Sequence, residues 1–182
     1  MGSKRFFRTA KDFYILGLWL ADGYWRSSSI GLTSVTPVLL DRFTMFLRKV
    51  APSHPLKRRI YQVDGKHKRK QMAVQVYVNS RFLTRLFMKL KIGVLPVPTS
   101  YISAYLAGRI DGDGHVDTKY RTGIRIAYSS KEDALRDQRL LGIANVSLYQ
   151  YKAANTFVLY LRKHYREQIL KDLQKFSVKL AP

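Results

Sequence analysis

The sequence of 182 residues contains no cysteine and only four histidines. Without cysteine the chain can form neither a disulfide framework nor a zinc site built on thiolates, and the four histidines are scattered and form no ligand pair. No apolar run approaches the roughly 18 residues of a membrane span. The basic N-terminus lacks the long apolar stretch of a signal peptide. We therefore expect an intracellular protein, in the cytoplasm or nucleoid of a prokaryote or in an organelle.

Acidic residues are also scarce, because 12 Asp and Glu stand against 33 Lys and Arg, a net charge of +21. Disorder is not expected, since 46% hydrophobic and 13% aromatic residues predict a packed core. A folded domain this basic most often binds nucleic acid, and a generic solvated surface or a membrane-surface patch are the alternatives. Residues 1–91 hold 19 basic and 4 acidic side chains, and much of this excess lies in residues 57–70.

The chain contains an internal repeat of half its length. Residues 15–23 read ILGLWLADG and residues 106–114 read LAGRIDGDG, so that the two Asp-Gly pairs lie 91 residues apart. Each segment is typical of a helix that ends at glycine. In each half, patterns of period 2 and of helical period then predict two strands, a helix, two strands and a helix. The sequence thus predicts an α+β fold of two pseudo-symmetric α-β-β-α-β-β-α halves, residues 1–95 and 96–182.

Small residues recur at one spacing in both motif helices. Gly17 and Ala21 are four residues apart in the first, and Gly108 and Gly112 are four apart in the second. Residues at this spacing share a helix face. Because glycine inside a helix costs about 1 kcal/mol relative to alanine, its repeated use needs a reason. We expect these four residues to let the two motif helices pack almost backbone to backbone at the interface of the halves.

An aspartate ends each motif helix, although an anion is unfavourable at a helix C-terminus. If the helices lie side by side and parallel, the carboxylates of Asp22 and Asp113 converge and repel each other. Two local rules broken at matching places indicate a functional site. A divalent metal ion would offset both costs, and oxygen ligands suit Mg²⁺. Asp111 is not expected to be a ligand, because Leu20 stands at the matching position.

The two segments resemble the motifs of the LAGLIDADG homing endonucleases in their single-chain, two-motif form. The second segment differs from that motif only at Arg109 and Gly112, and the repeat order fits over nearly the whole chain. The resemblance implies antiparallel sheets that form a DNA-binding saddle and metal-dependent cleavage of both DNA strands. It also implies metal ligation by the Asp22 and Asp113 carboxylates and the Ala21 and Gly112 carbonyls. Mg²⁺ is the expected cofactor; we expect Mn²⁺ to substitute for it and Ca²⁺ to bind without supporting cleavage.

The resemblance makes double-stranded DNA the expected partner, bound by the strand faces opposite the core. Because the duplication supplies a pseudo-twofold, the protein is expected to act as a monomer. The alternation places Leu56 and Ile60 inward in residues 56–63, and Val74, Val76 and Val78 inward in residues 73–78. The residues predicted to contact DNA are Arg26, Ser29, Thr33, Lys57, Arg59, Tyr61, Gln75, Tyr77, Arg125, Ser147, Tyr149 and Tyr151, with Lys66, Lys68, Arg69 and Lys70 as a phosphate clamp.

One feature departs from the pattern of the family, which often has a basic residue just after the second strand of each half. Residues 32–36 and 126–130 contain no lysine or arginine.

The chain lacks the cysteine of protein splicing, and an intron-encoded enzyme is therefore expected. Two other functions fit the same scaffold, namely an RNA-binding intron maturase and a DNA-binding module that does not cleave. The intact pair of Asp22 and Asp113 favours the nuclease.

Overall fold

The computed structural model describes residues 6–64, 70–93, 97–116, 123–141, 146–151 and 156–181. Its contacts divide the chain into two units, which are residues 1–8 with 22–95 and residues 9–21 with 96–182. The predicted boundary near residue 95 therefore coincides with a boundary between units. Residues 9–21, which carry the first motif helix, group with the second unit, whereas the sequence prediction placed them in the first half.

Within the described residues the predicted element order is present in both halves, so the fold prediction is confirmed. The first half contains α1 (Ala10–Asp22), β1 (Gly23–Arg26), β2 (Ser29–Ser34), α2 (Pro37–Val50), β3 (Lys57–Asp64), β4 (Lys70–Asn79) and α3 (Arg81–Lys91). After a 3₁₀ turn at Thr99–Tyr101, the second contains α4 (Ile102–Asp113), β5 (Gly114–Val116), β6 (Gly123–Tyr128), α5 (Lys131–Leu141), β7 (Val146–Tyr151), β8 (Thr156–Arg162) and α6 (Lys163–Gln174).

The two sheets share one topology, which is the clearest trace of the duplication. Each is antiparallel and four-stranded, with the order β1-β2-β4-β3 in one unit and β5-β6-β8-β7 in the other. In each sheet the short strand that directly follows a motif helix lies at an edge, and the second strand pairs with the fourth. The aspartate that ends each motif helix is consequently followed at once by an edge strand.

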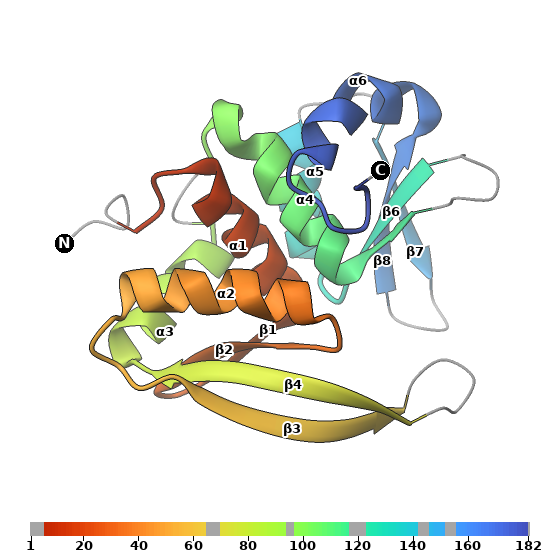
Figure 1. Ribbon diagram of the computed structural model, residues 1–182. Coiled ribbons are helices and arrows are strands. Elements are labelled where there is room, and N and C mark those ends of the chain that lie inside the picture. Colours follow the sequence, from red (N-terminus) through yellow and green to blue (C-terminus); the bar gives the residue numbers. More distant parts are fainter. Residues whose placement is uncertain are drawn as a thin grey trace. The chain divides into compact units, whose positions relative to one another are not determined.

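The core of the first unit lies between its sheet and the helices α2 and α3, which cover one face of the sheet (Figure 1). Ile30 and Leu32 of β2 are fully buried there, and Phe7, Phe46 and Phe87 form an aromatic cluster with ring centroids 5.5–5.9 Å apart. The far end of the β3–β4 ribbon extends beyond the helices. Ile60, predicted to point inward, is 61% exposed in the edge strand β3, and Leu56, just before this strand, is exposed as well.

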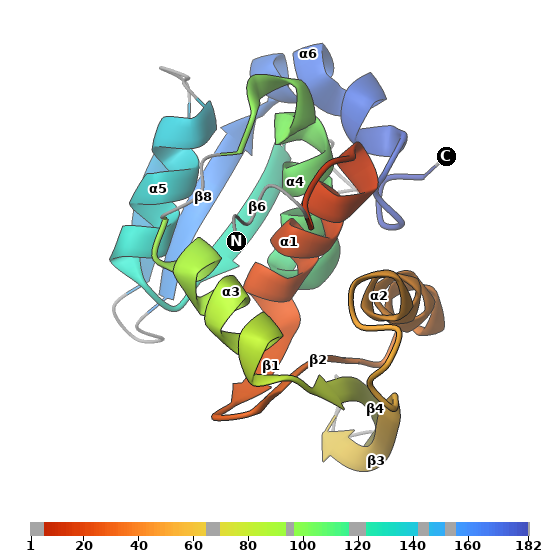
Figure 2. The same ribbon diagram turned by 90° about the vertical axis from the view of Figure 1, so that its left-hand side faces the viewer.

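The core of the second unit lies between its sheet and the helices α4, α5 and α6 (Figure 2). Ile124, Ile126, Leu159 and Leu161 point from the central strands into this core. Helix α4 is buried along residues 104–111, and α1 is buried along residues 12–19. A helix buried on all sides can carry apolar and small residues all round, which explains why neither motif helix is amphipathic.

Helix α1 begins with a capping box. The side chain of Asp12 accepts hydrogen bonds from the Thr9 amide at 3.0 Å and the Thr9 hydroxyl at 2.9 Å, and the Asp12 amide binds the Thr9 hydroxyl oxygen. Thr9 and Asp12 therefore cap the first turn of α1 together. Ser130 caps α5, with the Asp133 amide 3.3 Å from its hydroxyl oxygen.

Candidate functional site

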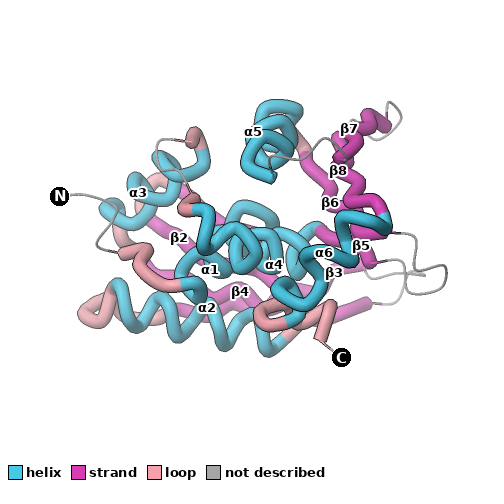
Figure 3. The backbone as a smooth tube through the Cα atoms, turned by 90° about the horizontal axis from the view of Figure 1, so that it is seen from above, coloured by secondary structure: helices cyan, strands magenta, loops and turns pink. Residues whose placement is uncertain are grey.

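The two motif helices touch through glycine. A Cβ atom added at Gly17 would collide with the carbonyl oxygen of Tyr105, and one added at Gly108 would collide with the carbonyl oxygen of Tyr14. The Cβ atom added at Gly108 would also lie only 2.7 Å from the Leu18 amide nitrogen. Helices α1 and α4 therefore meet at backbone contact, and they lie side by side when the protein is seen from above (Figure 3). Ala21 and Gly112, the other predicted interface residues, are half-buried nearer the helix ends.

Asp22 and Asp113 are the last residues of α1 and α4, and both are half-buried. Burial raises the pKa of the Asp113 carboxyl, and the nearby charges of Arg109 and Lys179 partly offset this rise. Among the described residues, no hydrogen bond to the Asp113 carboxylate is formed. Asp113 thus combines partial desolvation with unused oxygen atoms, as a metal ligand does before it binds its ion.

The donor set for a metal ion is small. The described residues contain no cluster of three or more histidine, cysteine, aspartate or glutamate side chains. The ligand set predicted from the sequence, which is the two aspartates with the carbonyls that precede them, stays a prediction. The Gly112 carbonyl already accepts a hydrogen bond from the Lys179 ammonium at 2.8 Å. The oxygen chemistry fits Mg²⁺, but one of the candidate oxygens is shared with a lysine.

Asp111 has a structural position, as the sequence comparison with Leu20 predicts. It is 2% exposed, and its carboxylate accepts hydrogen bonds from the Tyr14 hydroxyl at 2.7 Å and the Ser177 hydroxyl at 2.6 Å. The amides of Val178 and Lys179 donate to it as well. Asp111 thus joins α1, α4 and the segment after α6, and all of its oxygen capacity is used by the protein.

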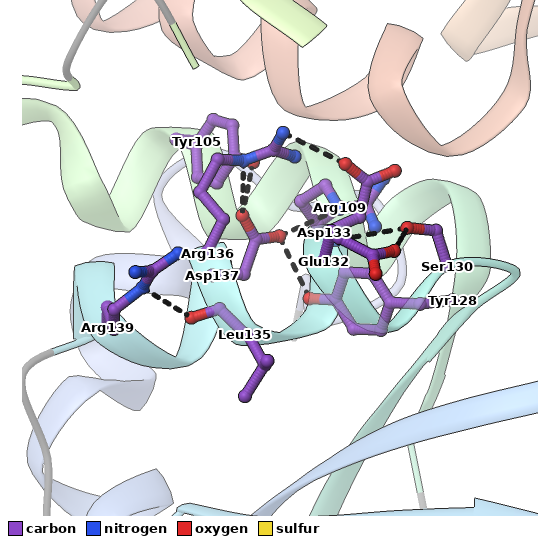
Figure 4. Close-up of polar contacts among 10 residues, drawn as sticks. All are labelled: Tyr105, Arg109, Tyr128, Ser130, Glu132, Asp133, Leu135, Arg136, Asp137 and Arg139. Carbon is purple, nitrogen blue, oxygen red and sulfur yellow. Dashed lines mark hydrogen bonds and ion pairs between the residues drawn. The ribbon is translucent and has the colours of Figure 1, made fainter. Parts of the chain in front are cut away.

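A buried charge pair between α4 and α5 was not predicted from the sequence. Arg109, one of the two departures from the motif, donates from Nε to the Asp137 carboxylate of α5 at 3.1 Å (Figure 4). The hydroxyls of Tyr105 and Tyr128 donate to the same carboxylate at 2.7 and 2.9 Å. Burial, followed by the Asp137 charge, raises the pKa of both tyrosines. This network explains the arginine as a link between helices within the second unit.

The predicted DNA-contacting residues of the first half share one face of their sheet. The register pairs Gln75 with both Thr33 and Arg59, and Lys57 with Tyr77. Gln75 donates to the Thr33 hydroxyl at 3.0 Å and accepts from the Tyr61 hydroxyl at 3.1 Å. This face is the one opposite α2 and α3. Tyr24 of β1, which sequence reasoning missed, lies there too, with its ring 6.0 Å from that of Tyr77.

Three of these predicted contacts are less accessible than expected. Ser29 and Tyr77 are each 7% exposed and Gln75 is 3% exposed, so little of these side chains reaches solvent, although they lie on the predicted face. The Arg59 guanidinium lies over the Tyr77 ring at 5.0 Å, and both ends of the Gln75 amide are occupied by neighbours. The exposed members of the face are Arg26, Lys57, Arg59 and Tyr61, whereas Thr33 is half-buried.

The predicted phosphate clamp lies mostly outside the described residues. Lys66, Lys68 and Arg69 belong to the segment 65–69, which the structure does not describe. Lys70, the first residue of β4, is exposed at the end of the β3–β4 ribbon.

The corresponding face of the second sheet has a shallow pocket of about 210 Å³ lined by Arg125, Tyr149, Val158 and Tyr160. Arg125 and Tyr149 are exposed, and the guanidinium of Arg125 lies 5.7 Å from the Tyr160 ring. Ser147 and Tyr151 occupy alternating positions of β7 with Tyr149, and their side chains are outside the described set. Tyr160 was not predicted, although the alternation of residues 156–162 places its side chain on the face of β8 that Leu159 and Leu161 do not share.

The fold is that of known homing endonucleases. The homing endonuclease I-DmoI, in a study of mesophilic variants, matches with a TM-score of 0.66 at 15% identity, over 91% of this chain and 96% of that one. I-WcaI bound to its DNA recognition sequence matches with a TM-score of 0.65 at 12% identity, over 96% and 86%. Full-length DUF199/WhiA from Thermatoga maritima matches with a TM-score of 0.66 at 15% identity, over 96% and 58%.

The comparison with curated protein sequences gives no match. Residues 100–176, however, match the family model of the LAGLIDADG-like domain. This match covers less than half of the chain. Together with the duplicated fold, it shows that the chain is similar to the LAGLIDADG family. No helix among the described residues is long and apolar enough to cross a membrane.

Proposed function

We propose that the protein is a site-specific endonuclease of the homing type, which hydrolyses both strands of double-stranded DNA with divalent metal ions. One observation carries this proposal: each of two closely packed helices ends in a half-buried aspartate directly before the edge strand of a sheet. Solved structures of I-DmoI that resemble this chain hold DNA with Ca and DNA with Mn, which fits a divalent ion.

The residues proposed to hold the ions are Asp22 and Asp113, with the carbonyls of Ala21 and Gly112. When bound, a divalent ion supplies the activation of water and the stabilisation of the leaving oxygen. The protein supplies position, because the Gly17 and Gly108 contact fixes the two helices against each other. Each half would act on one strand, so that the duplicated chain would cut a duplex without forming a dimer.

Recognition is assigned to the outer faces of the two sheets. Arg59 and Tyr61 in the first sheet and Arg125 and Tyr149 in the second are exposed and combine positive charge with flat aromatic surfaces. A strand of ten residues spans roughly 33 Å, about ten base pairs, so the target would be near twenty base pairs long. Since the two faces differ in sequence, the target would not be palindromic. The basic segment 65–70 would hold phosphates.

The proposal is tested by cleavage selection on a library of random duplexes, with Mg²⁺ compared with Ca²⁺. Asp22→Asn and Asp113→Asn should each abolish double-strand cleavage, because each removes one ligand charge from the proposed site. DNA binding should survive or tighten, since a negative charge near phosphate is removed. Asp41→Asn is the matched control: it removes the same charge from an exposed position on α2 and should cut as the parent does. If the variant with both changes cuts as fast as the parent, the assignment is wrong.

A second candidate is a DNA-binding protein on the same scaffold that does not cleave. The observation in its favour is the Lys179 ammonium on the Gly112 carbonyl, where a metal ion would bind. This reading predicts that the parent binds a defined duplex and never cuts it with Mg²⁺ or Mn²⁺. A structured intron RNA as competitor distinguishes the maturase, which would bind the RNA in preference to any duplex DNA. The intron origin and the intracellular location are further parts of the proposal.

A further inference from the structure

A lysine covers the C-terminus of the second motif helix. The Nζ atom of Lys179 lies 3.0 Å from the Ile110 carbonyl oxygen, 2.8 Å from that of Gly112 and 2.9 Å from that of Gly114. Ile110 and Gly112 lie in the last turn of α4, where the carbonyls carry partial negative charge, and Gly114 begins β5. The Ile110 carbonyl also accepts a hydrogen bond from the Gly114 amide. An ammonium has three N–H donors, and here each has one carbonyl within reach. The end of α4 is therefore a small cage of oxygens with a cation inside it.

The backbone beside this lysine is fixed in place. Asp111 accepts hydrogen bonds from the Val178 amide at 2.7 Å, the Lys179 amide at 3.0 Å and the Ser177 hydroxyl at 2.6 Å. Ser177 and Leu180 are themselves buried, and the Leu180 amide binds the Ser177 hydroxyl oxygen at 3.1 Å. Segment 177–180 is thus tied to α4 one turn from the cage. The side chain of Lys179 is nevertheless exposed, so its ammonium can withdraw into water.

The cage overlaps the oxygen atoms that the proposed metal site needs. Gly112 supplies one of the proposed carbonyl ligands, and the Asp113 carboxylate follows it in the chain. Mg²⁺ requires such oxygens at about 2.0–2.1 Å. An ion at that distance from the Gly112 carbonyl would lie next to the ammonium that binds the same oxygen, and the two positive charges would repel each other.

We propose that Lys179 is a tethered cation that competes with a divalent metal ion for the Gly112 end of α4. This inference rests on the proposed metal site and adds a control of that site by the chain itself. Occupation by the ion requires the ammonium to leave the cage, and Asp111 keeps it close enough to return. The metal affinity of the second motif is then set by a residue 67 positions away in the sequence.

The test is the affinity of the DNA-free protein for Mn²⁺ alone, measured by titration calorimetry and by the electron paramagnetic resonance signal of free Mn²⁺. Lys179→Met should bind Mn²⁺ roughly tenfold more tightly, as expected when one positive charge beside a divalent ion is removed. Lys179→Arg keeps the charge and should stay within about twofold of the parent, well below that charge effect. Lys175→Met is the matched control, because it removes the same charge from an exposed residue paired with Asp172.

Several results would overturn the inference. Unchanged or weaker binding by Lys179→Met, or the same gain in Lys175→Met, would show that the lysine only caps the helix. Absence of Mn²⁺ binding in both the parent and Lys179→Met would also overturn it, while the DNA cleavage assay decides separately whether the protein is a nuclease. If Lys179→Met does not fold, the competition is tested in the parent protein instead, by measuring how fast an acetylating reagent labels Lys179 and Lys175. Added Mg²⁺ should then increase labelling of Lys179 relative to Lys175, and equal labelling contradicts competition.

Discussion

The close contact between the motif helices predicts that alanine in place of glycine lowers the stability of the protein, whereas helix propensity alone predicts a gain. Replacing glycine by alanine inside a helix normally stabilises it by about 1 kcal/mol. At Gly108, however, the new Cβ would collide with the Tyr14 carbonyl oxygen and lie 2.7 Å from the Leu18 amide nitrogen. These are backbone atoms of a buried helix, which cannot rotate away as a side chain can. Gly108→Ala should therefore destabilise the protein.

The size of the loss follows from the separation that the methyl group demands. Ordinary contacts are about 3.5 Å, so the helices must move apart by roughly 1 Å, and overpacking of this kind costs about 1–3 kcal/mol. Because the new Cβ meets rigid backbone atoms, the cost should lie at the upper end of this range, about 3 kcal/mol. Subtracting the propensity gain of about 1 kcal/mol leaves a net loss of about 2 kcal/mol. At 2–4 °C per kcal/mol for a chain of this size, the melting temperature should fall by about 4–8 °C.

The assay is thermal unfolding followed by circular dichroism, with calorimetry for the enthalpy. The pair Lys171→Ala and Lys171→Gly calibrates propensity at an exposed position of α6, where alanine should be the more stable by about 1 kcal/mol. Gly17→Ala should lose as much as Gly108→Ala, because its Cβ would collide with the Tyr105 carbonyl oxygen. A Gly108→Ala protein that melts at or above the temperature of the parent would refute the close helix contact.

Two further predictions concern the second unit. Asp137→Asn should lower the free energy of unfolding, measured in denaturant, by about 3–5 kcal/mol, because it leaves the buried Arg109 charge uncompensated. The control Asp133→Asn breaks only a partly exposed ion pair and should cost less than about 1 kcal/mol. Equal losses in the two variants would contradict the buried network. Because burial raises the pKa of Asp113 above its usual value, the folded protein disfavours the charged form, and stability is lost as the pH rises from the ordinary range of an aspartate through the raised pKa. Asp113→Asn should therefore have a higher melting temperature than the parent at neutral pH, and this difference in melting temperature should vanish in acid. Mn²⁺ should raise the melting temperature of the parent but not that of the variant. A difference in melting temperature that stays constant with pH would contradict the burial of Asp113.

The sequence by itself determined the duplication, the order of the elements and the motif helices. The elements and the motif helices depend on residues two, three or four positions apart, and such local periods are visible in one sequence. The duplication is visible because the same motif and pattern return 91 residues later. The pairing of glycines with aspartates at matching places also indicated which helices meet, because two costly local choices point to a shared contact. For the same reason Asp111 could be separated from Asp113, since only one of them has a counterpart in the first half.

The tertiary structure alone decided what surrounds these residues. Lys179 reaches the Gly112 carbonyl, Asp137 pairs with Arg109, and Tyr61 and Thr33 occupy the amide of Gln75, although the partners lie 14 to 67 residues apart. The alternation of β4 correctly put Gln75 and Tyr77 on the outer face, but it could not show that neighbouring strands would cover them. Strand and helix periods give the direction of a side chain, whereas its burial and its partners depend on segments that only folding brings together.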